Sequence, residues 1–196
     1  MNIVSSKWVF KIKTRSNGSI ERYKARLVTR GFTQLPGLDY AKTFSPVIKP
    51  SNTWLTLTIG LSQGWSVRQL DISNAFLHGN LQERVYLAQP QGFEDSFHPD
   101  HVCHLYKDLY GLKQTPQAWY LKFNTYIQQM GFIWCPYNQS LCYRTQGSNI
   151  LLLLIYVDDI LLTGSSSSHI FKFIAHLSTT FYMKDLGDIH YFLGFK

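Results

Sequence analysis

This sequence has few cysteines, no recognisable secretory signal pattern and no apolar run of membrane-spanning length, and each of these features argues against a class of protein. Only 3 of the 196 residues are cysteine, and none of the three stands at zinc-ligand spacing from another. The sequence shows no secretory signal pattern, so we expect a reducing, intracellular compartment rather than a secreted disulfide scaffold. The one candidate membrane segment, residues 150–162, is too short for a span and holds two aspartates. We therefore expect a soluble protein without a membrane partner.

Acidic residues are the scarcer charge. The chain has 12 Asp and Glu against 19 Lys and Arg, a formal net charge of +7. Charged residues make up only 16% of the chain and apolar residues 45%, so a folded domain is expected rather than disorder. Aromatic residues reach 15%. Basic side chains pair with phosphates and aromatic side chains stack on bases, so this composition favours a nucleic-acid partner. An ordinary basic protein can share the same composition.

Two adjacent aspartates stand in the most apolar part of the chain. Asp158 and Asp159 are preceded by the apolar residues 150–157 and followed by residues 160–164. Burying carboxylates costs free energy unless they pair or bind cations. The pattern predicts a β-hairpin with strands over 150–157 and 160–163 and both aspartates in its turn. Because Asp is a common turn residue, a third carboxylate is needed before the pair indicates chemistry.

A basic ribbon is predicted near the amino end. Residues 7–14 and 23–30 alternate apolar and basic side chains on either side of a turn signal at 16–19. Such a ribbon is suited to binding phosphates, and a solvated surface is the alternative. Its cations are Lys11, Lys13, Lys24, Arg26 and Arg30.

The rest of the chain predicts alternating helices and strands. In order, these are an irregular connection over 33–50, a helix over 51–64, a strand over 65–70, a turn or short helix over 74–79, a surface loop over 88–104, a helix from Thr115 to Gly131, the hairpin, a helix after Ser168 and a strand pair over 189–195. The side chains expected to point inward are Trp54, Leu57, Ile59 and Leu61, then Trp119, Phe123, Ile127 and Met130, then Ile170, Phe173, Ile174 and Leu177. Residues 66–195 thus follow the order β-α-β-β-α-β. This is a split βαβ arrangement, an antiparallel sheet with helices on one face and an open opposite face.

This arrangement supplies the third carboxylate. In a split βαβ sheet the strand that ends at Asp71 lies beside the hairpin, which brings Asp71 close to Asp158 and Asp159. Divalent cations relieve the repulsion among three carboxylates. Two Mg²⁺ ions about 3.5–4 Å apart can activate a hydroxyl and stabilise the leaving oxygen in a phosphoryl transfer. The basic ribbon is then suited to holding a triphosphate.

Six motifs carry a family resemblance that covers nearly the whole chain. Residues 67–79, VRQLDISNAFLHG, resemble the first palm motif of copia-type LTR-retrotransposon reverse transcriptases. Residues 24–34, KARLVTRGFTQ, resemble their fingers segment, and residues 109–119, LYGLKQTPQAW, the segment that packs template and incoming nucleotide. Residues 156–159, YVDD, are similar to the metal-binding hairpin. Residues 184–187, KDLG, and 191–194, YFLG, resemble the last palm motifs with the primer grip.

The resemblance implies an RNA-directed DNA polymerase domain that transfers a nucleotide from a dNTP to a primer 3′-hydroxyl. It implies an α+β fold, with a fingers ribbon and connection in residues 1–50. A palm would occupy residues 51–196 and include part of the fingers at about 80–120. It also implies that the thumb and RNase H domains lie outside these residues, so that the fragment is expected to be incomplete alone.

The resemblance also assigns residues. Asp71, Asp158 and Asp159 would bind two Mg²⁺ ions, with Mn²⁺ as a substitute, and the backbone carbonyl of Ile72 would be a further ligand. Phe76 would be the steric gate that excludes a ribose 2′-hydroxyl. The nucleotide-binding residues implied are Lys13, Arg26, Asn74, Ala75, Phe76, Gly111, Lys113 and Gln114, with the choice between Lys11 and Lys13 open. The template and primer residues implied are Pro116, Tyr156, Phe192, Leu193 and Gly194. Lys184 would donate a proton to departing pyrophosphate, or else be a solvated surface lysine.

The implied partners are an RNA template with a DNA or tRNA primer, dNTPs, and the thumb, RNase H and integrase segments of a parent Pol polyprotein. The implied location is a cytoplasmic virus-like particle with nuclear access for DNA integration. Two alternatives stay open. One is a catalytically inactive nucleic-acid-binding remnant, which would show steep salt dependence without Mg²⁺-dependent nucleotide binding. The other is a different two-metal palm enzyme, such as a nucleotidyl cyclase, to which the basic ribbon and the Thr115 helix do not belong.

Overall fold

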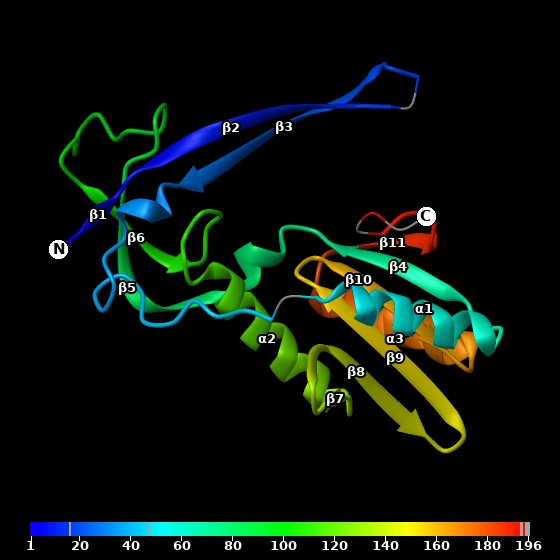
Figure 1. Ribbon diagram of the computed structural model, residues 1–196. Coiled ribbons are helices and arrows are strands. Elements are labelled where there is room, and N and C mark those ends of the chain that lie inside the picture. Colours follow the sequence, from blue (N-terminus) through cyan, green and yellow to red (C-terminus); the bar gives the residue numbers. More distant parts are fainter. Residues whose placement is uncertain (16, 47, 193, 195–196) are drawn as a thin grey trace. The chain divides into compact units, whose positions relative to one another are not determined.

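Two compact units share the chain in the computed structural model, which describes residues 1–15, 17–46, 48–192 and 194 (Figure 1). Unit 1 comprises Met1–Phe44 and Phe76–Lys122, and unit 2 comprises Ser45–Ala75 and Phe123–Lys196. The described residues form three sheets and three α-helices, so the predicted mixed class of helices and antiparallel sheet is confirmed. Within these residues no helix is both long and apolar enough to cross a membrane.

Unit 1 contains the predicted ribbon. Strands β2 (Ser6–Thr14) and β3 (Ile20–Thr29) pair antiparallel, with a register shift between Lys13 and Thr14 (Figure 1). Because side chains alternate along each strand, cross-strand pairing sorts them by face. The basic face carries Lys7, Lys11, Lys13, Arg22, Lys24 and Arg26, and the opposite face carries Trp8, Phe10, Ile12, Tyr23 and Leu27. The ribbon is therefore cationic on one side and apolar on the other.

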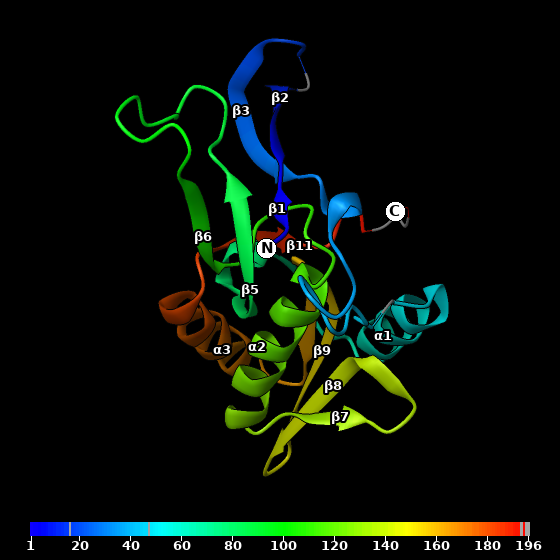
Figure 2. The same ribbon diagram turned by 90° about the vertical axis from the view of Figure 1, so that its left-hand side faces the viewer.

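A second sheet in unit 1 has the order β1-β5-β6. The short strand β1 (Ile3–Val4) runs parallel to β5 (Asn80–Ala88), and β6 (Val102–Lys107) runs antiparallel to β5. Val4, Val85, Leu87 and Leu112 form its buried cluster. The sequence did not predict β1, and the predicted surface loop is confirmed over residues 89–101 (Figure 2).

Two glycines let the loop after β6 approach the end of the ribbon. Gly111 has φ +96°, and a Cβ there would overlap the carbonyl oxygen of Thr29. Gly31, in the 3₁₀ helix η1 (Gly31–Thr33), would in turn meet the carbonyl oxygen of Gly111. The backbone N–H of Thr29 donates to the Tyr110 carbonyl at 2.7 Å. Glycine is the residue that permits such a close approach of two backbones.

Unit 2 is built on a six-stranded antiparallel sheet with the order β11-β4-β10-β9-β8-β7. Its strands are β4 (Val67–Ile72), β7 (Ile133–Cys135), β8 (Asn138–Gln146), β9 (Asn149–Tyr156), β10 (Asp159–Gly164) and β11 (Met183–Asp188). Strand β4 is the predicted strand that leads to Asp71, and it pairs with β10 of the predicted β9–β10 hairpin. Strand β11 lies on the other side of β4. The β7–β8 hairpin was not predicted.

Helices cover both faces of this sheet, so the prediction of helices on one face only is wrong. Helix α1 (Pro50–Ser62) packs Leu57 against the cluster that contains Val67. On α3 (Ser167–Thr180), the Phe171 ring lies 5.0 Å from the guanidinium of Arg68. Since Val67 and Arg68 are neighbours in β4, they point to opposite faces. Figure 2 shows α1 and α3 on either side of the sheet.

The predicted apolar face of α1 is wrong at Trp54 and Leu61, whereas Leu57 packs against the sheet as predicted. Its buried residues are Thr53, Thr56 and Gly60, whereas Trp54 is 59% exposed and Leu61 73%. A Cβ at position 60 would lie 2.8 Å from the Val67 side chain. Small residues therefore face the sheet because the helix lies too close to it for large side chains.

The other two helices follow the predicted patterns. Helix α2 (Thr115–Gln129) buries Trp119, Phe123 and Ile127, and Gly131 follows its end with φ +82°. Helix α3 buries Ile170, Phe173 and Leu177, and leaves Ile174 half-buried. The last strand lies earlier than predicted, at β11 rather than over 189–195, where residues 189–191 form no strand. Leu193 and Phe195 lie outside the described residues.

Replacing Gly111 by Ala should destabilise the fold strongly, because a Cβ there meets the Thr29 backbone, which cannot rotate away. Gly37→Ala is a matched control: it has φ +77° but nothing within 4 Å of the new Cβ. We expect a loss of about 1–2 kcal/mol for Gly37→Ala from the left-handed backbone alone, and a clearly larger loss for Gly111→Ala in urea unfolding. Equal losses would show that the close approach costs nothing.

Candidate functional site

The aspartate hairpin turns one residue earlier than the sequence suggested. Strand β9 ends at Tyr156, the two-residue loop is Val157–Asp158, and Asp159 already begins β10. Val157 has φ +56° while Asp158 does not have a positive φ, the φ pattern of a type II′ hairpin turn. A β-branched residue in this region is strained by roughly 1–3 kcal/mol. The turn thus presents Asp158 at its tip and keeps Asp159 in the sheet.

The register of β10 on β4 brings two of the predicted carboxylates together. Asp159 stands directly opposite Asp71. The backbone N–H of Ile72 donates to the carbonyl oxygen of Asp158 at 2.8 Å, which makes Ile72–Asp158 a hydrogen-bonded pair. Asp71–Asp159 is then the adjacent non-hydrogen-bonded pair, in which side chains lie closest, with Cα atoms about 4.5 Å apart. Asp71 thus lies inside β4, which ends at Ile72, one residue beyond the predicted strand end at Asp71.

The three carboxylates interact electrostatically. Burial and, after it, the negative charges of Asp158 and Asp71 raise the pKa of Asp159 to about 6, against a hydrogen bond from Gln69 that lowers it. The cluster therefore holds more negative charge than its surroundings stabilise. A cation bound among these oxygens would offset the repulsion that Asp159 experiences from Asp158 and from Asp71.

The donor set suits a hard divalent cation. Carboxylate oxygens are the ligands that Mg²⁺ takes, usually in small number and together with substrate oxygens. Among the described residues, no three or more His, Cys, Asp or Glu side chains are placed so that they could hold a metal ion. The protein thus offers charge and donor chemistry at this hairpin without a closed cage.

Within unit 1, an aromatic residue links two of the predicted nucleotide-binding residues. The guanidinium of Arg26 lies 5.1 Å from the centroid of the Tyr110 ring, and that ring contacts Phe76 edge-on at 5.4 Å. The Nε of Arg26 is buried and has no hydrogen-bond partner among the described residues. Buried donors are nearly always paired, so Arg26 has an unused donor. Sequence reasoning missed Tyr110 as a separate residue, although it lies inside the quoted segment 109–119.

Two other predicted nucleotide-binding side chains have partners inside the protein. Gln114 is buried, and its amide donates to the Asp39 carbonyl at 2.8 Å and lies 3.0 Å from the Gln34 side chain. The ammonium of Lys113 donates to the Tyr40 hydroxyl at 3.1 Å and lies 4.8 Å from the centroid of the same ring. These contacts tie residues 109–115 to residues 34–40, which is a structural role.

The remaining predicted residues are placed as follows. Lys13 stands opposite Arg22, whereas Arg26 stands opposite Val9, so Lys11 is nearer to Arg26 along the ladder than Lys13. Lys184 stands opposite Asp71 on β11. Asn74 has φ +55°, Ala75 is buried, Pro116 lies in the first turn of α2, and Tyr156 packs on the sheet cluster. Phe192 is 1% exposed and Gly194 has φ +96°, while Leu193 lies outside the described residues.

Asp108 is a buried acid that the sequence did not single out. It is fully buried, its Oδ1 accepts from the Thr115 hydroxyl at 3.0 Å, and its Oδ2 has no partner among the described residues. Its backbone N–H donates to the Gly79 carbonyl at 3.2 Å. Its pKa is raised to about 6, mainly by burial and to a smaller extent by the charge of Glu83, against the Thr115 hydrogen bond that lowers it. Asp108 thus joins the turn after Phe76 to the start of α2.

The fold and the hairpin define an α/β protein with a cluster of carboxylates on an antiparallel sheet, and comparison with known proteins gives its family. The family model described as "Reverse transcriptase (RNA-dependent DNA polymerase)" matches residues 1–196. The chain belongs to this reverse transcriptase family, in the copia-type group that its motifs resemble.

Relatives from plants and yeast give the extent of the similarity. The chain is 46% identical over its whole length to the retrovirus-related Pol polyprotein from transposon RE2 of Arabidopsis thaliana, of which it covers 14%. It is 43% identical over 97% of its length to the Pol polyprotein from transposon TNT 1-94 of Nicotiana tabacum, of which it also covers 14%. The identity to the transposon Ty1-DR4 Gag-Pol polyprotein of Saccharomyces cerevisiae is 31% over 130 residues, or 66% of the chain and 8% of that polyprotein. The chain thus spans about one seventh of the plant relatives' length.

Asp108→Asn should stabilise the protein at neutral pH. A carboxyl with a pKa of about 6 when folded and an ordinary pKa of 3.8 when unfolded binds its proton more tightly in the folded state. Its contribution to stability is therefore complete below pH 4 and is lost as the pH rises through 6. The melting temperature of Asp108→Asn should exceed that of the native chain at pH 7.5, with the difference vanishing near pH 4. The exposed Asp100→Asn is the control. A constant difference across this pH range would contradict the assignment.

Proposed function

We propose that this chain is the part of a reverse transcriptase that binds the catalytic metal ions and the incoming dNTP. Unit 2 is the palm in this proposal and unit 1 carries the fingers. The observation that carries it is the cross-strand pair of Asp71 and Asp159 beside Asp158, where burial, together with the negative charges of Asp158 and Asp71, raises the pKa of Asp159 to about 6. Outside a cation site, such a concentration of half-buried negative charge would only destabilise the sheet.

In this proposal Asp71, Asp158 and Asp159 hold two Mg²⁺ ions, with the carbonyl of Ile72 as a further ligand. The ions supply charge stabilisation and an activated primer hydroxyl when bound. The protein supplies the geometry. The hydrogen bond from Ile72 N–H to Asp158 O fixes the turn against β4, and the fully buried Leu70 and Ile160 hold the two strands on either side of it.

The nucleotide's triphosphate would bind the basic face of the ribbon at Arg26, with Lys11 and Lys24 next to it on the ladder. A phosphate oxygen would give the buried Nε of Arg26 the acceptor that it lacks. Tyr110 would orient both Arg26 and Phe76, since it contacts the two side chains. We retain Gly111 as a backbone contact and assign Gln114 and Lys113 to holding the loop, because their polar atoms are already paired.

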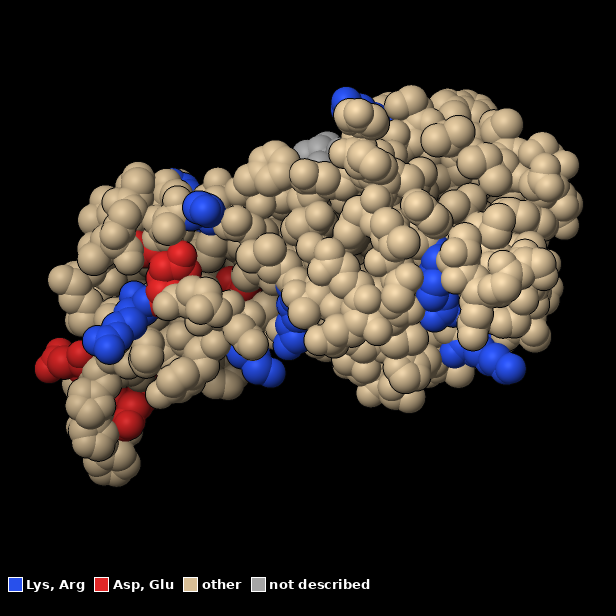
Figure 3. Space-filling model, turned by 90° about the horizontal axis from the view of Figure 1, so that it is seen from below, with Lys and Arg blue, Asp and Glu red and all other residues tan. Residues whose placement is uncertain are grey.

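Template and primer would be recognised by backbone and shape, since a copying enzyme must accept every sequence. The ribbon's basic face suits phosphates for this purpose also. Figure 3, a view from below, shows Lys and Arg side chains in several separate places on a largely uncharged surface. We therefore assign nucleic-acid phosphates to the ribbon, and expect binding that weakens steeply with salt. RNA template, tRNA or DNA primer, and the other Pol segments are proposed partners by family.

The inactive-remnant hypothesis is favoured by one observation: among the described residues, no three or more His, Cys, Asp or Glu side chains are placed so that they could hold a metal ion. The two hypotheses differ in whether the aspartates support nucleotide addition. Primer extension on poly(rA)·oligo(dT) with Mg²⁺ separates them, when run alongside a chain extended through its natural downstream sequence. Extension by either chain supports the polymerase, and duplex binding without any extension supports the remnant.

Asp158→Asn should abolish nucleotide addition, by more than about 100-fold, because a carbonyl dipole replaces a ligand charge. Binding of the duplex, measured by fluorescence anisotropy, should be unchanged or tighter because a negative charge is removed. The exposed Asp100→Asn serves as the control and should alter neither. Equal loss of binding and addition would mean that Asp158 maintains the fold instead.

Phe76→Ala should relax sugar selectivity. If the Phe76 ring fills the space of a ribose 2′-hydroxyl, its removal should raise the kcat/KM ratio of rNTP to dNTP by roughly ten-fold or more. The matched control is Phe97→Ala, which removes a ring that is 88% exposed in the loop over 89–101. An unchanged ratio in Phe76→Ala would remove the gate assignment, and the ring would then be only a packing partner of Tyr110.

A further inference from the structure

The strand that carries Lys184 has little to fix its register. Strand β11 lies at the edge of the six-stranded sheet, and β4 is its only partner among the described strands. Along β11, Lys184, Asp185, Leu186 and Asp188 are exposed, and Gly187 adopts φ +89°. Register is set by an alternation of buried and exposed side chains, and is weakly specified in polar, glycine-containing strands. Something other than apolar burial must therefore hold β11 in place.

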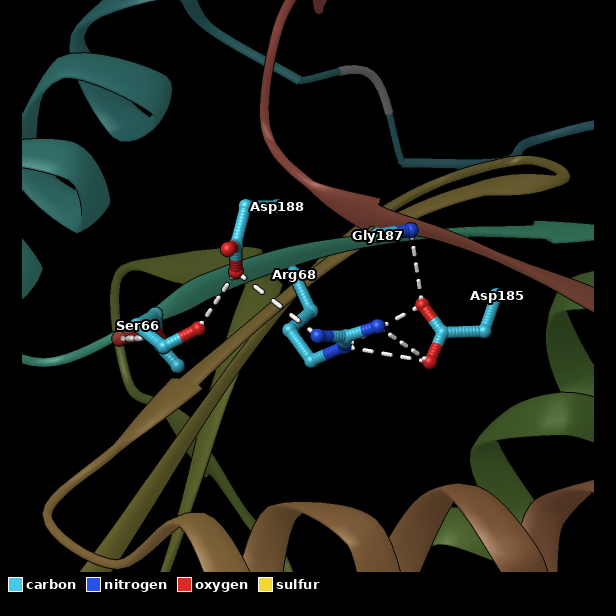
Figure 4. Close-up of polar contacts among 6 residues, drawn as sticks. Ser66, Arg68, Asp185, Gly187 and Asp188 are labelled. Carbon is cyan, nitrogen blue, oxygen red and sulfur yellow. Dashed lines mark hydrogen bonds and ion pairs between the residues drawn. The ribbon is translucent and has the colours of Figure 1, made fainter.

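Arg68 of β4 supplies that constraint (Figure 4). Its Nη2 lies 2.8 Å from Asp185 Oδ2, and its Nε lies 3.2 Å and 3.1 Å from the two Asp185 oxygens. Asp188 lies 3.8 Å from Nη1. The guanidinium also packs 5.0 Å from the centroid of the Phe171 ring on α3. A planar fork that pairs with one carboxylate at two positions and stacks on a ring is fixed in direction as well as in distance.

The partners of Arg68 are themselves anchored. The backbone N–H of Gly187 donates to Asp185 Oδ1 at 3.0 Å, which closes the bulge between Asp185 and Asp188. The Ser66 hydroxyl donates to Asp188 Oδ1 at 2.7 Å. Figure 4 shows these groups converging on Arg68 from β4 and β11. The network thus links β4, the β11 bulge and α3.

We propose that Arg68 is a positioning residue that fixes the register in which β11 sets Lys184 opposite Asp71. Lys184 and Asp185 are neighbours, so they point to opposite faces of the sheet. When Arg68 holds Asp185 on the α3 face, Lys184 must lie on the face of Asp71. A slip of one residue would put Asp185 opposite Asp71, adding a fourth negative charge to the cluster in place of a positive one. The clamp therefore decides the sign of the charge beside the candidate metal ligands.

The register can be measured directly by NMR on the native chain and on Arg68→Gln. Ser73 N–H donates to the Tyr182 carbonyl, so Ile72–Met183 and Leu70–Asp185 are non-hydrogen-bonded pairs, whose Hα atoms lie close enough for a strong NOE. We expect both Hα–Hα NOEs in the native chain and in Lys172→Gln, a control that removes an exposed cation from α3. Both should be lost in Arg68→Gln and weakened in Arg68→Lys, which keeps the charge but not the fork. Retention of both NOEs in Arg68→Gln overturns the proposal.

The effect on Lys184 rests on the proposed function and has its own readout. In single-nucleotide addition, Arg68→Gln should lower kcat by roughly ten-fold or more with KM for dNTP unchanged, as should Lys184→Ala, since positioned proton donors contribute about 10²–10⁴-fold. In the Lys184→Ala background, Arg68→Gln should cause no further loss. If the fold-losses in kcat of the two single variants multiply in the double variant, Arg68 does not act through Lys184. That result would overturn the proposed effect of Arg68 on catalysis. If the native chain adds no nucleotide, the proposed function fails, while the NOEs still decide the register.

Discussion

The cross-strand pair of Asp71 and Asp159 is the constraint on which the rest of unit 2 depends. Two carboxylates directly opposite each other in a sheet are destabilising, and here Asp158 adds a third charge. The strands can tolerate this only because the residues around the acids bury strongly. Leu70, Ile72, Ile160 and Leu162 are all fully buried, on the face that α3 covers. The cost of the charges is thus offset by the burial of apolar side chains that neighbour the aspartates on the same strands.

The constraint also explains the shape of the hairpin. A two-residue loop holds Asp158 at the tip while leaving Asp159 in register with Asp71, and it needs a positive φ at its first position. The chain places Val157 there rather than glycine. Strain of this kind persists only where the surrounding structure over-determines the backbone. Here the β9–β10 ladder and the hydrogen bond from Ile72 to Asp158 do so.

The sequence predicted the elements whose pattern is local and strong. The apolar run around Asp158, the alternation in the ribbon and the stripe of α2 each gave the right element, and order alone placed Asp71 beside the hairpin. Boundaries were less secure, as the turn at Val157 shows, because Asp is favoured in turns and tolerated in strands. The predicted inward positions of Trp54 and Leu61 on α1 were wrong because close packing at Gly60 selects small residues, which hydrophobicity cannot indicate. The β7–β8 hairpin was missed because β8 mixes polar residues with Cys142 and Leu141.

Family motifs and physical contacts agree on some residues and differ on others. A motif shows that a residue recurs in a family, but not whether its polar atoms bind the substrate or hydrogen-bond within the fold. The Gln114 side chain donates a hydrogen bond to the Asp39 carbonyl and accepts one from the Gln34 side chain. Its place in the motif is therefore explained by the loop that it holds. Arg26 lies in a motif too, yet its Nε is buried and lacks a partner among the described residues. A buried donor left unpaired costs roughly 1–3 kcal/mol. That cost is recovered only when an acceptor arrives, which makes Arg26 the stronger candidate for a ligand-binding residue.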